Sequence, residues 1–345
     1  MNIREQIEEK EYEELSPYAS HSGDSKGRKR AETECDIRTI YQRDRDRILH
    51  SKAFMRLKDK TQVFLAPQGD HYRTRLTHTL IVSQTARTIA KALSLNEDLV
   101  EAIALGHDLG HTPFGHAGEA ALNNMSEAGF THFEQSVRVV ELLEKNGNGL
   151  NLSWEVLDGI LNHQMDTLPA TLEGQVVRLC DKISYMHHDM EDAERAGIIT
   201  EDAIPITIRM VLGASTKERL DTFIHDIVTN SMGKERITMS GDVEAAMEAL
   251  REIMFAQVYR NPIAKSEEVK AKRMLSELYK YYIENPELMT SEYQELIQSG
   301  EKVDRVVCDY ISGMSDKYSI SQFEKIFIPL GWDLEHLEKT NDSAV

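Results

Sequence analysis

The stretch NEDLVEAIALGHDLGHTPFGH, residues 96–116, decides how the surrounding chain folds. Asn96 followed by two acids has the form of a helix N-cap with an acidic first turn, which the partial positive charge at a helix N-terminus favours. Leu99 and Ile103 then recur at helical spacing. We expect this helix to end around Gly110 to Pro113, because proline disfavours helical geometry in the residue before it.

Apolar residues recur with the same period in other stretches of helical length. Helices are predicted at 77–93, 116–127, 133–145, 153–163, 173–195, 242–260, 267–284 and 302–312. A β-favouring run at 61–65, followed by a turn at 67–70, allows at most one short hairpin. The chain contains neither a Walker A sequence nor a Gly-x-Gly-x-x-Gly motif. The predicted fold class is therefore all-α.

A chain of 345 residues can form one large domain with an appendage. Residues 16–34 are small, polar and rich in Gly and Ser, which indicates an extended or mobile segment. We predict a flexible arm over 1–35, a helical core over 36–200, and a C-terminal helical region over 201–345 that packs on the core.

The formal net charge of -18 argues against binding of nucleic acid by the whole surface. One segment departs from this charge: residues 26–60 contain 12 Lys and Arg against 6 Asp and Glu. Such a segment can be a solvated face with internal ion pairs, or it can face phosphate. The charge pattern leaves both readings open, and nucleic acid is not a predicted partner.

Cysteine usage and hydropathy indicate a cytoplasmic protein. Cys35, Cys180 and Cys308 are odd in number and lie far apart, so neither a disulfide framework nor a thiolate zinc site is indicated. No apolar run approaches the roughly 20 residues that a membrane-spanning helix requires, and residues 1–12 are acidic rather than typical of a signal peptide.

Histidines are concentrated in one window. Four of the 13 histidines lie between residues 107 and 132, and two acids of the same window are their candidate carboxylate partners. These residues are His107, Asp108, His111, His116, Glu119 and His132. Imidazole and carboxylate donors without thiolate suit an octahedral divalent ion used in hydrolysis.

Two adjacent residues of one helix cannot form such a site alone. His107 and Asp108 diverge by roughly a third of a turn, so they share an ion only if the helix presents its edge. His78 and Asp181, from two other predicted helices, are the best further donors. This set of four leaves two octahedral positions for water and a phosphate oxygen.

The predicted helix at 173–195 presents a polar face. Asp181, Tyr185 and Asp189 recur at four-residue spacing and so share one side of it. This helix could hold the ion at one end and hydrogen-bond a sugar at the other, while Lys182 could lean toward phosphate.

Structural roles remain open for individual histidines. A His-Asp pair alone is usually structural, and His111 and His116 could form hydrogen bonds at helix ends. His163, His187 and His188 are expected as core or surface groups, with His187 and His188 as alternative ligands.

Four segments carry a family resemblance: DRDRI (44–48), KTQVF (60–64), DHYRTRLTH (70–78) and HDLGHTPFGH (107–116). Together they resemble the bacterial dGTPase-like deoxynucleoside triphosphate triphosphohydrolases of the HD superfamily. The resemblance is dense over residues 16–195, and DYISGMSD (309–316) extends it more loosely. Phe133 and Lys317 depart from the family pattern, which puts local contacts in doubt but not the site.

The resemblance assigns roles to residues of this chain. It implies metal ligands at His78, His107, Asp108 and Asp181. It implies a catalytic group at the α-phosphate formed by His116, Glu119 and His132. It implies phosphate contacts from Arg75, His111 and Lys182, and deoxyribose contacts from Gln62, Tyr185 and Asp189.

The resemblance also implies the activity, which is cleavage of a dNTP, dGTP or several dNTPs, at the α-phosphate to deoxynucleoside and triphosphate. One divalent ion is expected as cofactor, whether Mn, Mg, Fe, Ni or Zn. A homo-oligomer and a second, effector nucleotide are typical of the family. The alternatives are another HD phosphohydrolase, acting on nucleoside monophosphates or cyclic nucleotides, and a nucleotide-sensing or nucleic-acid-binding protein.

Overall fold

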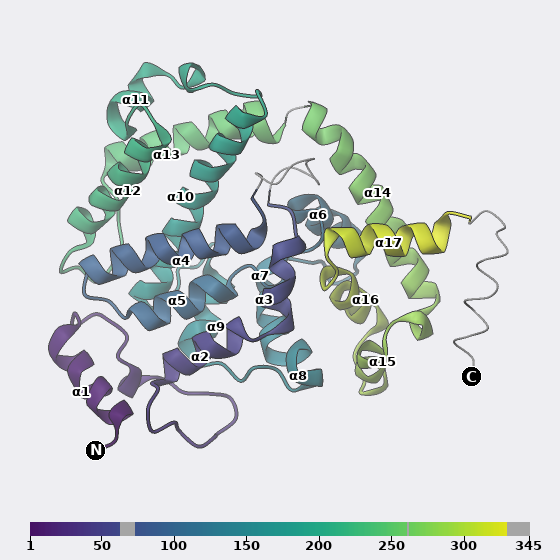
Figure 1. The fold of residues 1–345 in the computed structure, drawn as a ribbon, viewed down its shortest axis with the longest axis horizontal. Helices are drawn as coiled ribbons and strands as arrows, with labels where there is room; N and C mark the ends of the chain where they lie inside the picture. Colours follow the sequence, from purple (N-terminus) through teal and green to yellow (C-terminus); the bar gives the residue numbers. More distant parts are fainter. Residues whose placement is uncertain (63–72, 261, 330–345) are drawn as a thin grey trace.

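The computed structural model describes residues 1–62, 73–260 and 262–329 (Figure 1). Helices and their connections account for all of the regular structure in these ranges, apart from two isolated bridges, Arg28 with Ser153 and Thr61 with Thr74. The all-α prediction is confirmed for this part of the chain. The expected β-favouring run and turn lie almost entirely outside the described residues.

The α-helices have the following bounds: α1 (Ile3–Glu14), α2 (Ile40–Leu49), α3 (Lys52–Arg56), α4 (Arg75–Ala92), α5 (Glu97–Gly106), α6 (Gly115–Met125), α7 (His132–Arg138), α8 (Glu144–Gly147), α9 (Trp154–Asn162), α10 (Leu172–Arg195), α11 (Ile206–Leu212), α12 (Thr216–Ser231), α13 (Gly241–Met254), α14 (Pro262–Glu284), α15 (Ser291–Gln298), α16 (Val303–Ser312) and α17 (Asp316–Phe327). Short π-helical turns continue α7 at Val139–Leu143 and α13 at Phe255–Tyr259.

Helix α5 begins as predicted, since the Asn96 side chain accepts the backbone N–H of Leu99 at 3.2 Å. Its predicted end is wrong, because the helix stops at Gly106. The next residues bind α7 instead of continuing the helix: the Ser136 hydroxyl accepts the N–H of Gly110 at 2.9 Å and donates to the carbonyl of His107 at 2.7 Å. A side chain at Gly110 would meet the backbone N of Ser136 at 2.2 Å, so only glycine permits this close approach.

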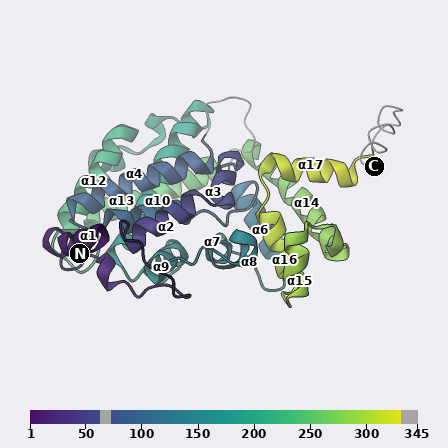
Figure 2. The same cartoon turned by 60° about the horizontal axis from the view of Figure 1, so that its bottom comes forward.

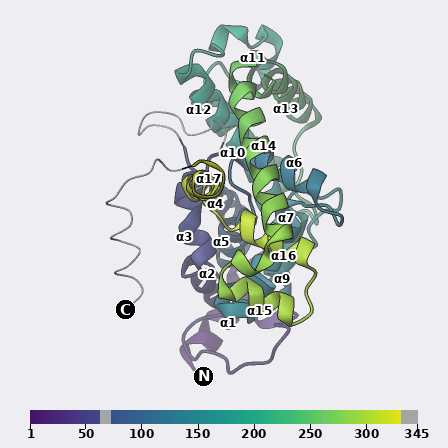
Figure 3. The same cartoon turned by 90° about the vertical axis from the view of Figure 1, so that its right-hand side faces the viewer.

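Two hydrophobic clusters organise the helices. The larger one is built from α2, α4, α5, α9 and α10, with α11 to α13 extending it. The smaller one joins α6 to α14 and α16. Figure 2 shows α14 to α17 at one end of the molecule and α1, α12 and α13 at the other. Figure 3 shows α14 running along the face that is turned toward the viewer. The loop from Asp108 to Phe114 crosses from one cluster to the other.

The first 35 residues, expected to form a flexible arm, contain helix α1 and a segment that is hydrogen-bonded to the core. The buried Glu173 of α10 accepts the backbone N–H of Ser20 at 3.0 Å. Glu155 of α9 accepts the backbone N–H of Lys26 at 2.7 Å. These contacts tie the segment to two core helices, while the division of the chain at 35 and 200 stays a prediction.

Across the described ranges, none of the helices combines the length and apolar composition that crossing a bilayer requires.

Candidate functional site

Helices α4, α5 and α10 pack against one another (Figure 1). The four predicted metal ligands lie close together where they meet. His78 comes from the first turns of α4, His107 and Asp108 directly follow α5, and Asp181 lies on α10. Asp181 Oδ1 is 3.1 Å from His78 Nε2 and 3.7 Å from His107 Nε2. Asp108 Oδ1 is 3.4 Å from His107 Nε2. Adjacent donors around an octahedral ion with bonds of about 2.1 Å are about 3 Å apart, so the spacing fits.

The hydrogen bonds of His107 leave one ring nitrogen free. Its Nδ1 lies 2.6 Å from the carbonyl of Ala104 and therefore carries the proton. Its Nε2 is buried and has no hydrogen-bond partner among the described residues. Buried polar atoms are rarely left in this state, and a backbone carbonyl on Nδ1 is the usual partner of a metal-binding histidine. The residues therefore fit a divalent ion.

Arg75 borders this group, and the Gln62 carbonyl lies nearby, 3.5 Å from where a Cβ at Gly115 would stand. Arg75 Nη1 donates to Asp108 Oδ2 at 2.9 Å, and both side chains are buried. A side chain at Gly115, where φ is +54°, would come within 2.9 Å of Arg75 Nη2, so glycine keeps this space open. The Gln62 Oε1 atom is buried and unpartnered in the described structure.

His116, Glu119 and His132 form a hydrogen-bonded group between α6 and α7. Glu119 Oε1 is 2.9 Å from His132 Nδ1, and its Oε2 is 3.2 Å from His116 Nδ1. Burial would raise the pKa of Glu119, but the hydrogen bonds from the two histidines hold it well below its usual range. His116 is 74% exposed, whereas His132 is buried. The carboxylate is therefore ionised and orients both imidazoles.

His111 links this group to the metal ligands. Its ring stacks on that of His132 at 3.9 Å, and its Nε2 is 3.4 Å from Asp108 Oδ1. Burial pushes the pKa of His111 well below its ordinary value, so the ring is neutral. His163, expected as a core or surface group, is buried with its Nε2 at 3.3 Å from His132 Nε2. Its ring also lies 5.1 Å from that of His107, between centroids, so two residues distant in sequence place it in the cluster.

The polar face of α10 extends away from Asp181. Burial raises the pKa of Tyr185 to about 12 and that of Asp189 to about 7, and it lowers the pKa of the half-buried Lys182. Asp189 accepts the hydroxyl of Tyr259. The sequence did not identify Tyr259, because it follows an amphipathic stretch in which tyrosine is an ordinary core residue.

The two alternative ligands lie outside the metal-binding groups. The described donors within 4.8 Å of one another form two sets, His78 with His107 and Asp108, and Asp108 with His111 and His132. Asp181 belongs to neither set and is joined to the predicted ligands through its distances to His78 and His107. His187 faces Glu191 at 3.6 Å, and His188 is buried with its ring edge toward His78. Of the two departures from the family pattern, Phe133 contacts the ring of His132, and Lys317 is exposed on α17.

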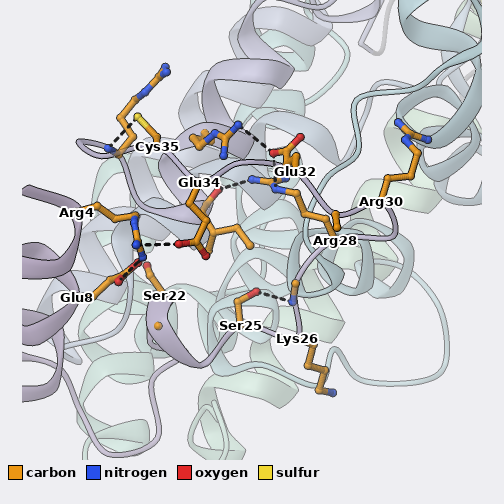
Figure 4. A pocket seen from close by; sticks show the side chains of 16 residues that line it. Arg4, Glu8, Ser22, Ser25, Lys26, Arg28, Arg30, Glu32, Glu34 and Cys35 are labelled. Carbon is orange, nitrogen blue, oxygen red and sulfur yellow. Dashed lines mark hydrogen bonds and ion pairs between the residues drawn. The ribbon is translucent and has the colours of Figure 1, made fainter. Parts of the chain in front are cut away.

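The basic segment is largely paired with acids. A cavity of about 360 Å³ lies beside it, lined by residues that include Arg4, Arg28, Glu32, Cys35 and Arg38 (Figure 4). Glu32 binds the guanidiniums of Arg28, Arg43 and Arg47 at 3.0, 3.0 and 2.5 Å. Buried Asp44 binds Arg28 from the other side. The internally paired reading of this segment is therefore supported, and the phosphate-facing one is not.

The chain matches two family models, the HD domain over residues 75–186 and the phosphohydrolase-associated domain over residues 237–325. It is 54% identical over 332 residues to a deoxyguanosinetriphosphate triphosphohydrolase-like protein of Caldanaerobacter subterraneus subsp. tengcongensis, covering 96% of this chain and 98% of that one. A protein of the same description from Clostridium perfringens is 50% identical over 338 residues, covering 95% and 98%.

A solved phosphohydrolase from Bacteroides thetaiotaomicron shares the fold, with a TM-score of 0.50 at 18% identity over 81% of this chain and 67% of that one. The curated relatives match nearly end to end, and the HD-domain match begins at Arg75 and includes all four candidate ligands. The chain therefore belongs to the deoxyguanosinetriphosphate triphosphohydrolase-like family of HD-domain hydrolases.

Proposed function

We propose that the protein hydrolyses deoxynucleoside triphosphates at the α-phosphate and releases deoxynucleoside and triphosphate. The observation that carries the proposal is the convergence of four buried donors, with His107 Nε2 unpartnered, directly beside the Arg75 guanidinium. The names of the relatives support dGTP as a substrate. The proposal places the enzyme in the cytoplasm as a homo-oligomer, and its free cysteines agree with a reducing compartment.

His78, His107, Asp108 and Asp181 would hold one divalent ion. When bound there, the ion would supply Lewis acidity toward a phosphate oxygen and toward water. The nitrogen and oxygen donors are compatible with Mn, Mg, Fe, Ni or Zn.

Arg75, His111 and Lys182 would bind the oxygens of the triphosphate. Arg75 is fixed by Asp108, so its remaining donors have a defined direction. Its guanidinium offers five N–H groups, of which Nε has no partner among the described residues. Arg75 is therefore prepared to bind a phosphate oxygen without losing its contact with Asp108.

His116 is the better candidate for protonating the leaving 5′-oxygen. Glu119 holds its Nδ1, and the rest of the ring is exposed. His132 is buried, and its Nε2 already faces His163. We therefore assign His132 and Glu119 to orienting His116, a role that general acid catalysis requires of such partners.

The deoxyribose would be recognised through hydrogen bonds from Gln62, Tyr185 and Asp189. Gln62 Oε1 and Asp189 Oδ1 are both buried without a partner in the described structure, so each can accept a hydrogen bond from a sugar hydroxyl. A site built to hydrogen-bond a hydroxyl rejects analogues that lack it, because its buried polar atoms then stay unpaired.

Product analysis tests the proposal. The purified protein, supplied with Mn²⁺ or Mg²⁺, should convert each active dNTP into deoxynucleoside and triphosphate in equal amounts. Release of pyrophosphate or of single phosphate would contradict this cleavage position. Turnover of nucleoside monophosphates or cyclic nucleotides, with none of dNTPs, would favour another HD phosphohydrolase. Testing the four dNTPs singly and in pairs would reveal an effector nucleotide as activation of one by another.

A further inference from the structure

A buried carboxylate on α17 reaches the candidate site from the C-terminal region. Asp316 is 5% exposed, and its Oδ1 accepts the backbone N–H of Phe114 at 3.0 Å. Its Oδ2 accepts the backbone N–H of Thr61 at 3.0 Å and also the Thr61 hydroxyl. One side chain therefore binds two segments that are far apart in the sequence.

Each of these segments leads directly to a proposed functional residue. Thr61 precedes Gln62, whose buried Oε1 has no partner in the described structure. Phe114 precedes α6, which carries His116 and Glu119. Phe114 has φ of +60°, a left-handed conformation that is costly for a non-glycine residue and that persists only when its surroundings enforce it. Asp316 accepts the backbone N–H of this residue, which immediately precedes the first residue of α6.

A second buried group strengthens the same junction. The Nζ of Lys60 is buried and donates to the carbonyls of His111 and Ser312, the latter at the end of α16. The carbonyl of Lys60 accepts the N–H of Arg75 at 3.1 Å. Two ionisable side chains thus connect the C-terminal helices to the segments around the site.

We propose that Asp316 is a positioning residue for the reaction, which through Thr61 and Phe114 fixes Gln62 relative to the His116 and Glu119 pair. The inference rests on the proposed function, because Gln62 and His116 act on substrate only if a nucleotide binds here. It gives the phosphohydrolase-associated region a part in catalysis. The Asp316 carboxylate accepts hydrogen bonds from Thr61 and Phe114, and among the described residues it has none with the four candidate metal ligands. Its proposed role is therefore separate from metal binding.

The first experiment compares Asp316→Asn with Asp304→Asn. Asparagine keeps one acceptor but places N–H donors where Thr61 also donates. Asp304 is a matched control, since it binds Ser126 at the far end of α6 at 2.9 Å and also the Tyr279 hydroxyl. We expect Asp316→Asn to lower kcat/KM for dGTP by about 10- to 100-fold with the metal content unchanged, and Asp304→Asn to change it by less than about twofold. Equal effects of the two variants would overturn the inference.

A double-mutant cycle separates positioning from a general structural role. If Asp316 acts through Gln62, the loss caused by Asp316→Asn should shrink to about threefold or less when Gln62 is already alanine. A residue that merely stabilises the fold would cause the same loss in both backgrounds, and that result would contradict the proposal. Where Asp316→Asn does not fold, Thr61→Val removes only the hydroxyl donor, and we expect a smaller loss with the same dependence on Gln62.

Hydrogen exchange tests the inference independently of turnover. The backbone amides of 57–62 and 111–119 should exchange faster in Asp316→Asn than in the wild type, and not in Asp304→Asn. Unchanged exchange in these segments would overturn the positioning role. A wild-type protein that hydrolyses no dNTP would instead contradict the proposed function, and the exchange result would still decide whether Asp316 fixes the two segments.

Discussion

Ionisable side chains gather in two regions, which differ in how completely their polar atoms are paired. In the N-terminal arginine segment, residues 26–47, Glu32 binds three guanidiniums and Asp44 binds Arg28 from the other side. In the histidine site, His107 Nε2 and His111 Nδ1 are buried with no partner among the described residues. Charges that stabilise the fold are paired within it, whereas buried ring nitrogens without a partner indicate that a ligand binds there. A high density of charge therefore does not locate a ligand site by itself.

Removing a histidine ligand should have the largest effect on activity. We expect His107→Ala to lower dNTP hydrolysis by about 10³-fold or more, because the ion loses one of its four protein ligands. The measurement is the initial rate with saturating Mn²⁺, together with the bound metal. His225→Ala, on the exposed side of α12, is the control and should leave both unchanged. Full activity in His107→Ala would contradict the claim that the histidine site, unlike the arginine segment, binds a ligand.

The arginine segment should respond in the opposite way. Asp44 is fully buried, binds Arg28 and accepts the backbone N–H of Ser153 at 2.8 Å. Removing one partner of a buried ion pair typically costs 3–5 kcal/mol, so Asp44→Ala should lower the free energy of unfolding by about 3 kcal/mol or more. Denaturant unfolding would measure this, while kcat/KM of the folded protein should stay within about twofold. A large loss of activity at unchanged stability would assign the segment a direct role in the reaction.

The kcat of the enzyme should depend on the charge of Glu119 rather than on the shape of its side chain. Glu119→Gln keeps the size of the side chain but removes the negative charge that orients His116 and His132, and we expect kcat to fall by about 10²-fold. Glu134→Gln, which alters an α7 acid bound to Thr131, should change kcat by less than about twofold. Comparable kcat values in the two variants would show that Glu119 is structural.

A smaller effect concerns pH. Burial raises the pKa of Asp189 to about 7 in the folded protein, against about 3.9 in an unfolded chain. The folded state therefore favours the protonated carboxyl, and this contribution to stability is present below about pH 4 and lost as pH rises through 7. Relative to Asp189→Asn, the wild type should lose stability across this window by at most about 1.4 kcal/mol per pH unit. Parallel stability curves for the two proteins would show that Asp189 is ionised throughout.

The sequence predicted the features that depend on residues close to one another along the chain. The Asn96 cap and the periodicity of α5, α9 and α10 are local, and the structure has helices there. The end of α5 was placed too late, because the contacts of Gly110 with Ser136 come from a helix that follows later in the chain. No predicted range corresponds to α1, α11, α12, α15 or α17.

The residues of the candidate site also fall into those that local sequence predicted and those that depend on distant contacts. His107 and Asp108 are adjacent, but their approach to His78 and Asp181 depends on how three helices cross, and the family resemblance rather than the spacing gave strong support to that set. His163, Tyr259 and Asp316 were not identified, since each meets the site through a residue distant in sequence. Whether the basic segment faces phosphate could not be decided from charge, because the answer depends on where Glu32 and Asp44 lie.

Metal stoichiometry tests the central claim most directly. Equilibrium dialysis against Mn²⁺ should give one tightly bound ion per wild-type chain, and no tightly bound ion in His78→Ala or Asp181→Ala. The Asp44→Ala protein, kept under conditions in which it is folded, should still bind one. Undiminished binding in both ligand variants, or a wild type that binds none, would contradict a site formed by side chains from α4, α5 and α10.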